Sequence, residues 1–401
     1  MSDVLLITVS GQDRPGITTR LTAVLAMCGA QVLDIAQSVI HNQLSLGLMV
    51  ELPTGEQAVI KEVLWAAHEL DMQVQFEPIE PDQYQVWASG GGAERHSIIL
   101  LGRGLDARQI SAATAVIADQ GLNILSIQRL SGRRGLACSS ARTCIELEVR
   151  GKPRDGAAMR AAFLDMAATL GIDIAIQADD MYRRTRRLVC FDMDSTLIQT
   201  EVIDELAEAA GVGAQVKAIT EAAMRGDLDF AASFRQRVAL LKGLDAAVME
   251  RIAAHLPLTE GAELLCRTLK RLGYKTAILS GGFTYFGAVL QRRLGIDFVH
   301  ANELEIVDGK LTGRHLGPII DAQAKARLLR EISASEGLSH QQTIAVGDGA
   351  NDLAMLSAAG LGIAFHSKPL VRASAEHAIS SLGLDALLYM IGLRDRQVDP
   401  S

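Results

Sequence analysis

The sequence is poor in cysteine and has no long hydrophobic run. Only five of its 401 residues are cysteine, and no two of them form a C-x-x-C pair, which excludes a disulfide framework and fits a reducing compartment. No uninterrupted apolar run reaches the roughly 18 residues that span a bilayer. The start, Met1 to Val4, has no basic segment ahead of an apolar one. We therefore expect a cytoplasmic protein that is neither exported nor inserted in a membrane.

Positive charge is also scarce. The 39 Lys and Arg residues are outnumbered by 47 Asp and Glu residues, which gives a net charge of −8. A chain of this charge repels a phosphate backbone, so nucleic acid is not an expected partner. Hydrophobic residues make up 49% and charged residues 21%, as in ordinary globular proteins and unlike disordered or fibrous chains. The length predicts two to four domains rather than a single core.

An internal repeat fills the N-terminal half. Each copy has the order strand, helix, strand, strand, helix, strand, and the second copy begins about 92 residues after the first. This βαββαβ order predicts two small domains at residues 1–80 and 96–179. The segment between them contains Pro81 and three consecutive glycines, so we expect a flexible linker at residues 80–92. The expected helices are residues 17–28, 56–70, 110–119 and 157–170.

A different pattern begins near residue 185. The basic cluster at residues 183–187 follows two aspartates and is expected to be a solvated linker with no role of its own. Residues 188–191 then form an apolar run typical of a buried parallel strand, and residues 201–255 are helical throughout. From residue 276 strands and helices alternate, which predicts a parallel sheet with helices on both faces and ligands at the carboxyl ends of its strands. The helical block would form a cap over those ends.

Polar residues gather at these strand ends. Asp192 and Asp194 follow the first strand, and an extended chain sends both side chains to one side, where they can share a cation. Residues 280–282, Ser-Gly-Gly, offer a hydroxyl and free N–H groups to an anion, and residues 347–352 offer carboxylates to a hard cation such as Mg²⁺. Lys325 lies on a helix between them. Each piece alone is more typical of a helix cap, a turn or a solvated side chain, but their order and common position indicate an active site.

With these motifs the chain resembles the phosphoserine phosphatases of the haloacid dehalogenase (HAD) superfamily, preceded by two ACT-like domains. The superfamily motifs cover residues 188 to about 395: the D-x-D-x-T loop of residues 192–196, residues 280–282, Lys325 and residues 347–352. The phosphoserine branch is indicated by residues 201–205, Met224, Phe230, Arg237 and residues 259–261. The resemblance implies an α/β fold in which two ferredoxin-like ACT domains precede a HAD-like Rossmannoid parallel sheet. That phosphatase domain would span residues 185–401, with its helical cap at about residues 201–257.

The resemblance also implies a mechanism. In this family the first Asp is the nucleophile, so Asp192 would attack phosphorus and form an aspartyl-phosphate. Asp194 would protonate the leaving oxygen and then deprotonate the hydrolytic water. Mg²⁺ and Lys325 would offset the repulsion between carboxylate and phosphate. The implied Mg²⁺ ligands are Asp192, the backbone carbonyl of Asp194, and Asp348; the implied phosphate-binding groups are Ser280, Gly281 and Lys325, with Asn351 orienting that end of the site.

The implied substrate is O-phospho-L-serine, converted to L-serine in the final step of serine biosynthesis. By the same resemblance Glu201 would face the substrate ammonium and Arg237 would bind its carboxylate in bidentate fashion. Met224 and Phe230 would close over the substrate, although plain packing within the cap explains them equally well. Two other readings stay open: a phosphatase or phosphotransferase of the same fold acting on another small phosphate ester, and a non-catalytic amino-acid sensor.

ACT modules commonly bind amino acids at interfaces between paired copies. The first copy carries the recognisable loop at residues 11–17, in which Gly16 permits a ligand to approach the backbone closely. The second copy, at residues 102–108, keeps an Asp and loses the Pro-Gly pair. The resemblance therefore implies a homodimer with serine as a candidate effector at the ACT domains, while a purely structural role for either copy stays equally open.

Overall fold

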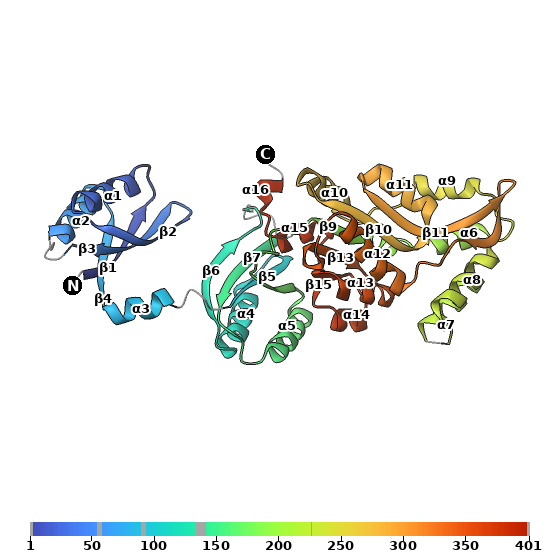
Figure 1. The fold of residues 1–401 in the computed structure, drawn as a ribbon, viewed down its shortest axis with the longest axis horizontal. Coiled ribbons are helices and arrows are strands. Elements are labelled where there is room, and N and C mark those ends of the chain that lie inside the picture. The colour runs from blue at the N-terminus through green and yellow to red at the C-terminus, as the bar shows by residue number, and fades with distance from the viewer. Residues whose placement is uncertain (1–2, 54–57, 90–93, 134–141, 226, 399–401) are drawn as a thin grey trace. The chain divides into compact units, whose positions relative to one another are not determined.

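The computed structural model describes residues 3–53, 58–89, 94–133, 142–225 and 227–398 (Figure 1). The chain divides into two compact units, residues 1–93 and 94–401. Every helix in the described part of the chain is too short or too polar to cross a membrane.

The first unit is a four-stranded antiparallel sheet with two helices. Its sheet has the order β2-β3-β1-β4, and its elements follow the predicted βαββαβ sequence: β1 (Asp3–Gln12), α1 (Ile17–Met27), β2 (Gln31–Ile40), β3 (Gln43–Leu52), α2 (Ala58–Glu69) and β4 (Gln73–Ile79). Alternate residues of β1, Leu5, Ile7 and Val9, are buried in the same core as residues of both helices. The strand period of two and the helix period therefore direct their apolar residues to one shared face.

The predicted flexible linker is wrong in part. Residues Pro81–Ser89 form a helix, α3, none of whose side chains is buried. Proline is common in loops, but it also suits the first position of a helix. The backbone N–H at that position makes no hydrogen bond within the helix, so its absence in proline costs nothing, and the fixed φ of proline matches that of the helix. The three glycines of the predicted linker lie outside the described residues.

The second unit begins with the second βαββαβ module. Its antiparallel sheet has the order β6-β7-β5-β8, and its elements are β5 (Arg95–Arg103), α4 (Ala107–Asp119), β6 (Asn123–Arg129), β7 (Arg142–Arg150), α5 (Gly156–Leu170) and β8 (Asp173–Ala178). The Asp retained in the loop of this copy, Asp106, caps α4: its carboxylate accepts a hydrogen bond from the backbone N–H of Gln109 (2.9 Å).

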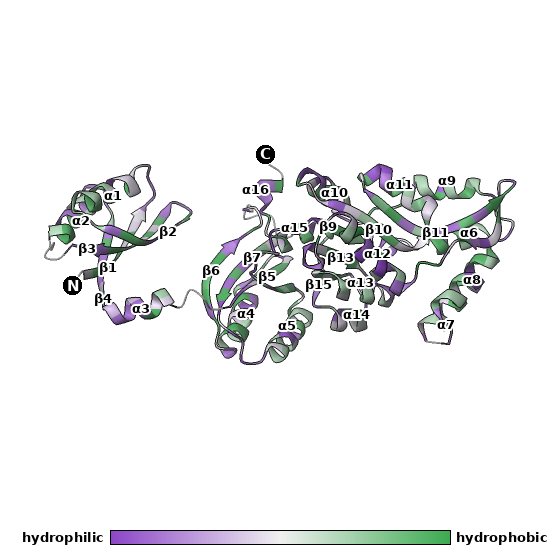
Figure 2. Ribbon diagram, in the orientation of Figure 1, coloured by the Kyte–Doolittle hydropathy of each residue, from purple (hydrophilic) through white to green (hydrophobic). Residues whose placement is uncertain are grey.

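A seven-stranded sheet forms the rest of this unit, with the order β12-β11-β10-β9-β13-β14-β15. All neighbouring strands are parallel except β12, which pairs with β11 as a hairpin. The central strands are hydrophobic (Figure 2), and every residue of β9 and β13 is buried. The strands are β9 (Leu188–Phe191), β10 (Lys275–Phe283), β11 (Phe298–Val307), β12 (Lys310–Leu316), β13 (Thr343–Gly347), β14 (Leu361–Phe365) and β15 (His377–Ile379).

Helices cover both faces of this sheet, as predicted. One core cluster joins Val189 and Phe191 of β9 to α10 (Ala262–Arg271) and α11 (Thr284–Leu294). A second cluster joins Leu188 and Cys190 to α12 (Ala322–Ser335), α13 (Leu353–Ala358) and α14 (Pro369–Ser374). From β9 the chain first adds β10 on one side of this strand and later adds β13 on its other side. Ligands bind where the strand order reverses in this way, so the crevice for ligands lies at the carboxyl end of β9.

The predicted helical block between β9 and β10 is confirmed. It consists of α6 (Val202–Ala209), α7 (Gly213–Met224), α8 (Phe230–Leu240) and α9 (Ala247–Ala254). Phe234 and Val238 of α8 and Leu206 of α6 are buried in the core cluster that also holds α10 and α11. The cap is thus continuous with the hydrophobic core on one face of the sheet.

The sheet of the second βαββαβ module packs, through its helix-free face, on the part of the chain that holds the seven-stranded sheet. Ile98 and Leu100 of β5 point to the helices of the module, whereas Ile99 and Leu101 belong to the same core cluster as β9 and α10. Asp173 reinforces the contact, since its carboxylate accepts hydrogen bonds from the backbone N–H groups of Ser380 (2.8 Å) and Ser381 (3.0 Å). Residues 94–401 therefore form one compact unit, within which the expected boundary near residues 179–185 lies.

The basic cluster of residues 183–187 is not a solvated linker. Arg183 is 2% exposed and pairs with Glu146 of β7 and with Asp179, and Arg186 is 5% exposed and donates to Gln177 (3.0 Å). The prediction failed because Glu146 lies 37 residues away along the chain, so local charge patterning does not reveal it. Arg184 is exposed, as predicted. Arg187 is exposed as well, but its guanidinium lies over the ring of Tyr274, 5.6 Å from its centre.

Candidate active site

The loop after β9 carries the two predicted catalytic aspartates. The backbone N–H of Asp192 donates to the carbonyl of Val346 (2.9 Å), which ties the start of the loop to β13. The tight turn η2 (Met193–Leu197) follows, and Ser195 within it has a left-handed backbone with φ of 55°. This turn leaves both carboxylates buried, with Asp192 5% and Asp194 8% exposed.

Lys325 reaches Asp192 from the first turns of α12. Its Nζ lies 2.9 Å from Oδ1 of Asp192 and 2.7 Å from Oδ1 of Asp352, and the side chain is 1% exposed. Burial opposes the charged ammonium, but the charges of Asp192 and Asp352 outweigh burial and raise the pKa of Lys325. The lysine, which by itself would be expected to be solvated, is therefore a buried cation between two carboxylates.

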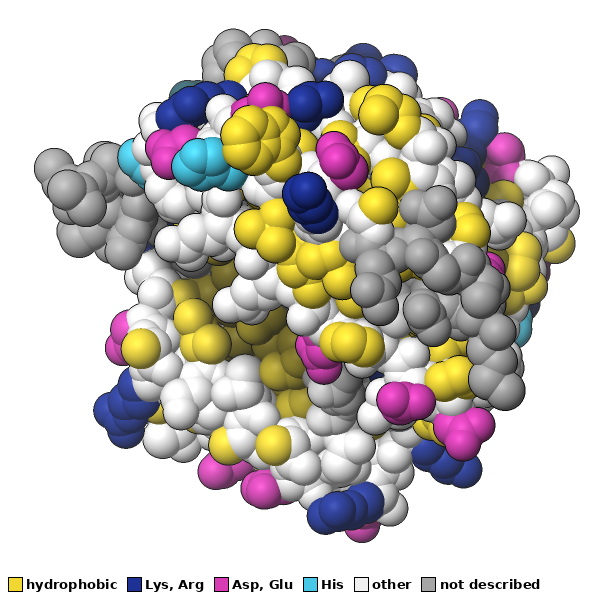
Figure 3. Space-filling view, turned by 90° about the vertical axis from the view of Figure 1, so that its left-hand side faces the viewer, with side chains coloured by type: hydrophobic (Ala, Val, Ile, Leu, Met, Phe, Trp, Pro, Cys, Tyr) yellow, Lys and Arg dark blue, Asp and Glu magenta, His cyan; other side chains and the backbone are white. Residues whose placement is uncertain are grey.

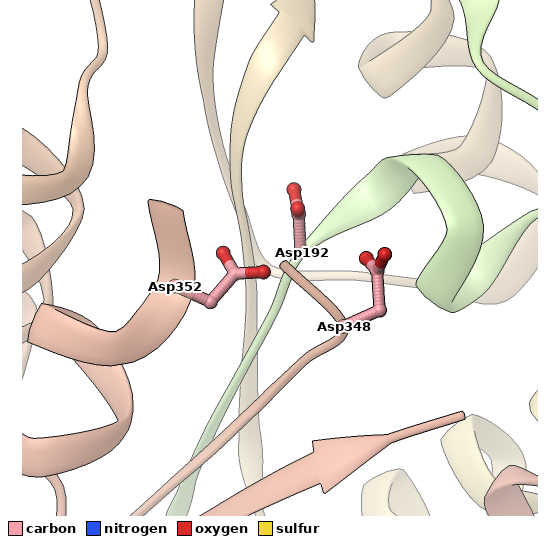
Figure 4. Close-up of side chains that lie close together, drawn as sticks. All are labelled: Asp192, Asp348 and Asp352. Carbon is pink, nitrogen blue, oxygen red and sulfur yellow. The ribbon is translucent and has the colours of Figure 1, made fainter. Parts of the chain in front are cut away.

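Three carboxylates meet at the carboxyl ends of β9 and β13 (Figure 4). Asp192, Asp348 and Asp352 each place an oxygen within 4.8 Å of the others. Burial, and then the charge of Asp352, raises the pKa of Asp348 to about 7. Burial and Asp352 also raise the pKa of Asp192, against the effect of Lys325. So much negative charge beside one lysine favours a bound cation, and carboxylate oxygens suit a hard divalent ion.

Asp194 lies on the cap side of Asp192. Its Oδ1 accepts a hydrogen bond from the backbone N–H of Val202, the first residue of α6 (3.0 Å). Burial, followed by the charge of Glu201, raises the pKa of Asp194 to about 8, against the effect of the Val202 N–H. The raised pKa favours the protonated form of this carboxyl, which is the form that a general acid requires.

The Ser-Gly-Gly segment at the end of β10 faces Asp194. Ser280 is fully buried, and its Oγ accepts a hydrogen bond from the N–H of Gly282 (2.9 Å). A Cβ on Gly282 would lie 2.4 Å from Oδ2 of Asp194, so only glycine fits between this loop and the carboxyl group. A Cβ on Gly281 would lie 3.0 Å from Cζ of Phe230, which places this cap residue directly over the loop.

The predicted specificity residues lie in the cap. Glu201 is exposed just before α6, and its Oε1 accepts a hydrogen bond from the hydroxyl of Ser195 (2.8 Å). Arg237 is half-buried in the last turn of α8. Burial lowers the pKa of Arg237, while the nearby charges of Glu201, Asp204 and Asp194 oppose the shift. The side chain of Met224 lies outside the described residues.

Two further residues join the site. Asp352 belongs to the segment 347–352, whose carboxylates are expected to face a cation, but the sequence assigned it no role of its own. It is fully buried, and its Oδ2 accepts a hydrogen bond from the backbone N–H of Gly349 (3.0 Å). Thr196 donates from Oγ1 to Oδ1 of Asp348 (3.2 Å). The four-residue spacing from Asp348 was the available signal for Asp352. Asn351 is half-buried beside it, with its side-chain oxygen over Gly349.

Comparison with known families assigns each part of the chain. Residues 3–77 and 94–177 match ACT domains, and residues 186–360 match the haloacid dehalogenase-like hydrolases. The fold and the site together define a haloacid dehalogenase-like hydrolase with two ACT domains.

Proteins similar to this chain over nearly its whole length identify the family within these hydrolases. The phosphoserine phosphatase of Streptomyces coelicolor is 44% identical over 402 residues, covering 99% of this chain and 95% of the relative. The phosphoserine phosphatase of Mycobacterium tuberculosis is 42% identical, covering 98% and 94%. A solved HAD family hydrolase from Salmonella enterica serovar Typhi aligns with a TM-score of 0.63 at 32% identity, covering 74% of this chain and 99% of that one. The chain belongs to the phosphoserine phosphatase family and is a phosphatase enzyme.

Proposed function

We propose that the protein is a Mg²⁺-dependent phosphatase that hydrolyses O-phospho-L-serine to L-serine and inorganic phosphate. The observation that carries the proposal is the buried triad of Asp192, Lys325 and Asp352, with Asp194 packed against the Ser-Gly-Gly loop. A nucleophile, a charge-compensating cation and a proton donor thus surround one end of the β9 crevice. Residues 185–401 would supply the chemistry, and residues 1–80 and 96–179 its regulation.

In the first step an oxygen of Asp192 attacks phosphorus, and the bond from phosphorus to the serine oxygen breaks. Asp194 gives its proton to the departing oxygen, so that L-serine leaves as a neutral alcohol rather than an alkoxide. The ammonium of Lys325, 2.9 Å from Oδ1 of Asp192, lowers the repulsion between carboxylate and phosphoryl group. The hydroxyl of Ser280 and the N–H of Gly281 hold phosphoryl oxygens.

In the second step water attacks the phosphorus of the aspartyl-phosphate. Asp194, now ionised, takes a proton from the water, and the bond from phosphorus to Asp192 breaks. Phosphate leaves, Asp192 is again a carboxylate and Asp194 is again protonated, so both residues return to their starting state. The cap, with Phe230 over Gly281, keeps other water molecules away from the intermediate.

The acidic cluster fits a divalent cation. Carboxylates of Asp192 and Asp348 and the backbone carbonyl of Asp194 would hold Mg²⁺; Asp352 is also within reach but is already bonded to Lys325 and Gly349. When bound, the ion neutralises carboxylate charge and polarises phosphoryl oxygens. Its arrival would also favour the ionised form of Asp192, which the nucleophilic role requires.

Selectivity for phosphoserine would come from the cap. Glu201 offers a carboxylate to the substrate ammonium, and Arg237 offers a planar fork to its carboxylate. In support, the charges of Glu201 and Asp194 act against the lowering of the pKa of Arg237, and the charge of Glu201 helps to raise the pKa of Asp194, as expected of groups that lie near one another.

The proposal is tested by phosphate release from L-phosphoserine and from p-nitrophenyl phosphate, with Mg²⁺ and with a chelator. Asp192→Asn should abolish release from both substrates. Arg237→Ala should raise KM for phosphoserine by roughly 10- to 100-fold and leave p-nitrophenyl phosphate nearly unaffected, since that substrate has no carboxylate. Arg235→Ala, an exposed neighbour on α8, is the matched control. Equal losses on both substrates for Arg237→Ala would refute the assigned role.

The ACT modules would bind an amino-acid effector, for which serine is the candidate, and would join two chains in a homodimer. In support, β2 is an edge strand of the first module, and its Val32, Ile35 and Ile40 are 48%, 49% and 80% exposed. Figure 3 shows that hydrophobic side chains are also exposed on the face of the molecule that it draws. Sedimentation measures the oligomeric state, and phosphate release with added L-serine measures the effect; a monomer whose rate does not respond to serine would refute both parts.

A further inference from the structure

Asn302 is a buried amide that no part of the proposed mechanism uses. It lies on β11 and is 1% exposed. Its Nδ2 donates to the carbonyl of Gly281 (2.8 Å), and its Oδ1 accepts from the backbone N–H of Ile320 (2.8 Å). Both ends of the amide are therefore occupied by backbone groups from two other segments.

The hydrogen bond to Gly281 lies where the backbone pairing between β10 and β11 is interrupted. β10 and β11 pair regularly up to Leu279 and His300, and pairing resumes at Phe283 and Asn302, so residues 280–282 lie opposite the single residue 301. This bulge lets the Ser-Gly-Gly loop leave the sheet toward the active site, but it deprives the loop of regular ladder partners. The side chain of Asn302 supplies the donor that the carbonyl of Gly281 would otherwise lack.

The bond to Ile320 reaches the segment that leads into α12. Ile320 directly precedes Asp321, whose carboxylate caps the helix by accepting the N–H of Ala324 (2.8 Å). Lys325 follows in the first turns of this helix. The same segment touches the phosphate loop, since a Cβ on Gly281 would lie 3.7 Å from the carbonyl oxygen of Ile320. Asn302 thus lies where the Ser-Gly-Gly loop meets the segment that leads into α12, the helix that carries Lys325.

The orientation of the peptide between Gly281 and Gly282 is fixed from both sides. Its carbonyl bonds to Asn302, and its N–H bonds to Oγ of Ser280. The same peptide lies against Asp194, because a Cβ on Gly282 would come within 2.4 Å of Oδ2 of that residue. A rotation of this peptide would displace the Gly281 N–H and the Ser280 hydroxyl relative to Asp194.

We propose that Asn302 is a positioning residue for phosphoryl transfer: it sets the phosphate-binding loop against both Asp194 and the helix of Lys325 without touching the substrate. The inference rests on the proposed function of that loop. Displacements of about 1 Å in such a constellation cost on the order of 100-fold in rate, whereas a merely structural amide would affect stability alone.

Two variants separate the bonds. Asn302→Ala removes both, and Asn302→Asp keeps an acceptor for Ile320 but, when its carboxyl is ionised, cannot donate to Gly281. Wild type and variants are compared at the same pH values, so that the titration of Asp194 affects all of them alike. The control is Thr276→Val at the opposite end of β10, which removes the bond from its buried hydroxyl to Asp297 (3.2 Å) and leaves the loop intact. Thermal unfolding midpoints are measured for all three, because each is expected to lose some stability.

The deciding measurements are kcat and KM on L-phosphoserine, and inhibition by orthovanadate, which adopts the geometry of the transferring phosphoryl group. Both Asn302 variants should lower kcat by roughly 10- to 100-fold and weaken vanadate inhibition by a similar factor, with a much smaller change in KM. Thr276→Val should change neither. Asn302 variants that lose thermal stability but keep kcat and vanadate inhibition within about twofold of wild type would overturn the proposal.

The outcome for the wild type stands apart. If it hydrolyses p-nitrophenyl phosphate and not phosphoserine, the substrate assignment fails. The ratios of variant to wild-type kcat and vanadate inhibition are then measured with the aryl ester, and the same limits decide on Asn302. If it hydrolyses neither, the proposed function fails, and vanadate binding measured by calorimetry decides on Asn302: unchanged affinity in both variants overturns the positioning role, and parallel weakening supports it.

Discussion

Replacing Lys325 by methionine tests the electrostatics of the site most directly. Methionine has nearly the length of lysine but no charge, so Lys325→Met leaves the packing of α12 largely intact and removes the cation. Asp192 and Asp352, whose oxygens lie 2.9 and 2.7 Å from Nζ, then remain buried without their partner.

The magnitude follows from these distances. Two unit charges 2.9 Å apart attract by about 6 kcal/mol at an effective dielectric constant of about 20, and the second pair is similar. The cost of burying the three charged groups offsets most of this gain. Removing one partner of a buried ion pair lowers the free energy of unfolding by about 3–5 kcal/mol in measured cases, and we expect a loss of that size for Lys325→Met. Phosphate release should fall at least about 100-fold, because transition-state charge loses a preorganised cation.

Urea denaturation of wild type and variant, with a chelator and with Mg²⁺, measures the loss. Because a bound cation neutralises the same carboxylates, Mg²⁺ should restore part of the stability of the variant. Lys310→Met, an exposed position on β12, should stay within about 0.5 kcal/mol of wild type. A loss below about 1 kcal/mol for Lys325→Met, with activity retained, would refute the argument that Lys325 compensates the buried carboxylates.

Three other changes have defined outcomes. Gly282→Ala should abolish phosphate release, because the added methyl would lie 2.4 Å from Asp194 Oδ2; retained kcat would contradict this close approach of the loop to the acid. Asp173→Ala should lower the free energy of unfolding by about 3 kcal/mol, measured in urea, since Ser380 and Ser381 lose their acceptor; a neutral effect would show that this contact contributes little. Burial, followed by nearby arginines, lowers the pKa of His377 from 6.5 to about 3 in the folded protein. As the pH falls between these two values, the imidazole therefore becomes protonated in the unfolded chain and stays neutral in the folded one. Stability should therefore drop by about 2 kcal/mol from pH 6.5 to pH 5 because of this group, and His377→Gln should remove that part of the pH dependence.

The sequence predicted the parts of this molecule that depend on local order. The βαββαβ repeat, the helical cap and the alternation from residue 276 are all present, because hydrophobic periodicity of two or 3.6 survives in each segment. Of the residues expected at the strand ends, Asp192 and Asp348 directly follow β9 and β13, Asp194 lies in the turn after β9, and Ser280 lies in the last four residues of β10. A parallel sheet brings such ends together whatever the lengths of the connections.

The failures concern contacts between distant segments. Arg183, in the turn between β8 and β9, pairs with Glu146 of β7, and Asn302 joins the bulge in β10 to the segment that leads into α12. Neither residue stands in a motif, and an isolated arginine or asparagine carries no periodicity that reveals its partner. The prediction at Pro81 failed for a local reason. Proline is common both in loops and at the first position of a helix, and the sequence around it did not distinguish the two.

The coverage of the second ACT sheet by the catalytic core decides where this chain can be cut. Ile99, Leu101, Cys144 and Ala175 lie on the covered face and are buried. A fragment that begins at residue 94 keeps this face covered and should stay dispersed when expressed alone. One that begins at residue 185 loses the sheet and leaves the matching apolar surface of the catalytic part open to water, which favours aggregation. For deletion experiments on regulation, the first ACT module is the removable one, and the second belongs to the folding unit of the enzyme.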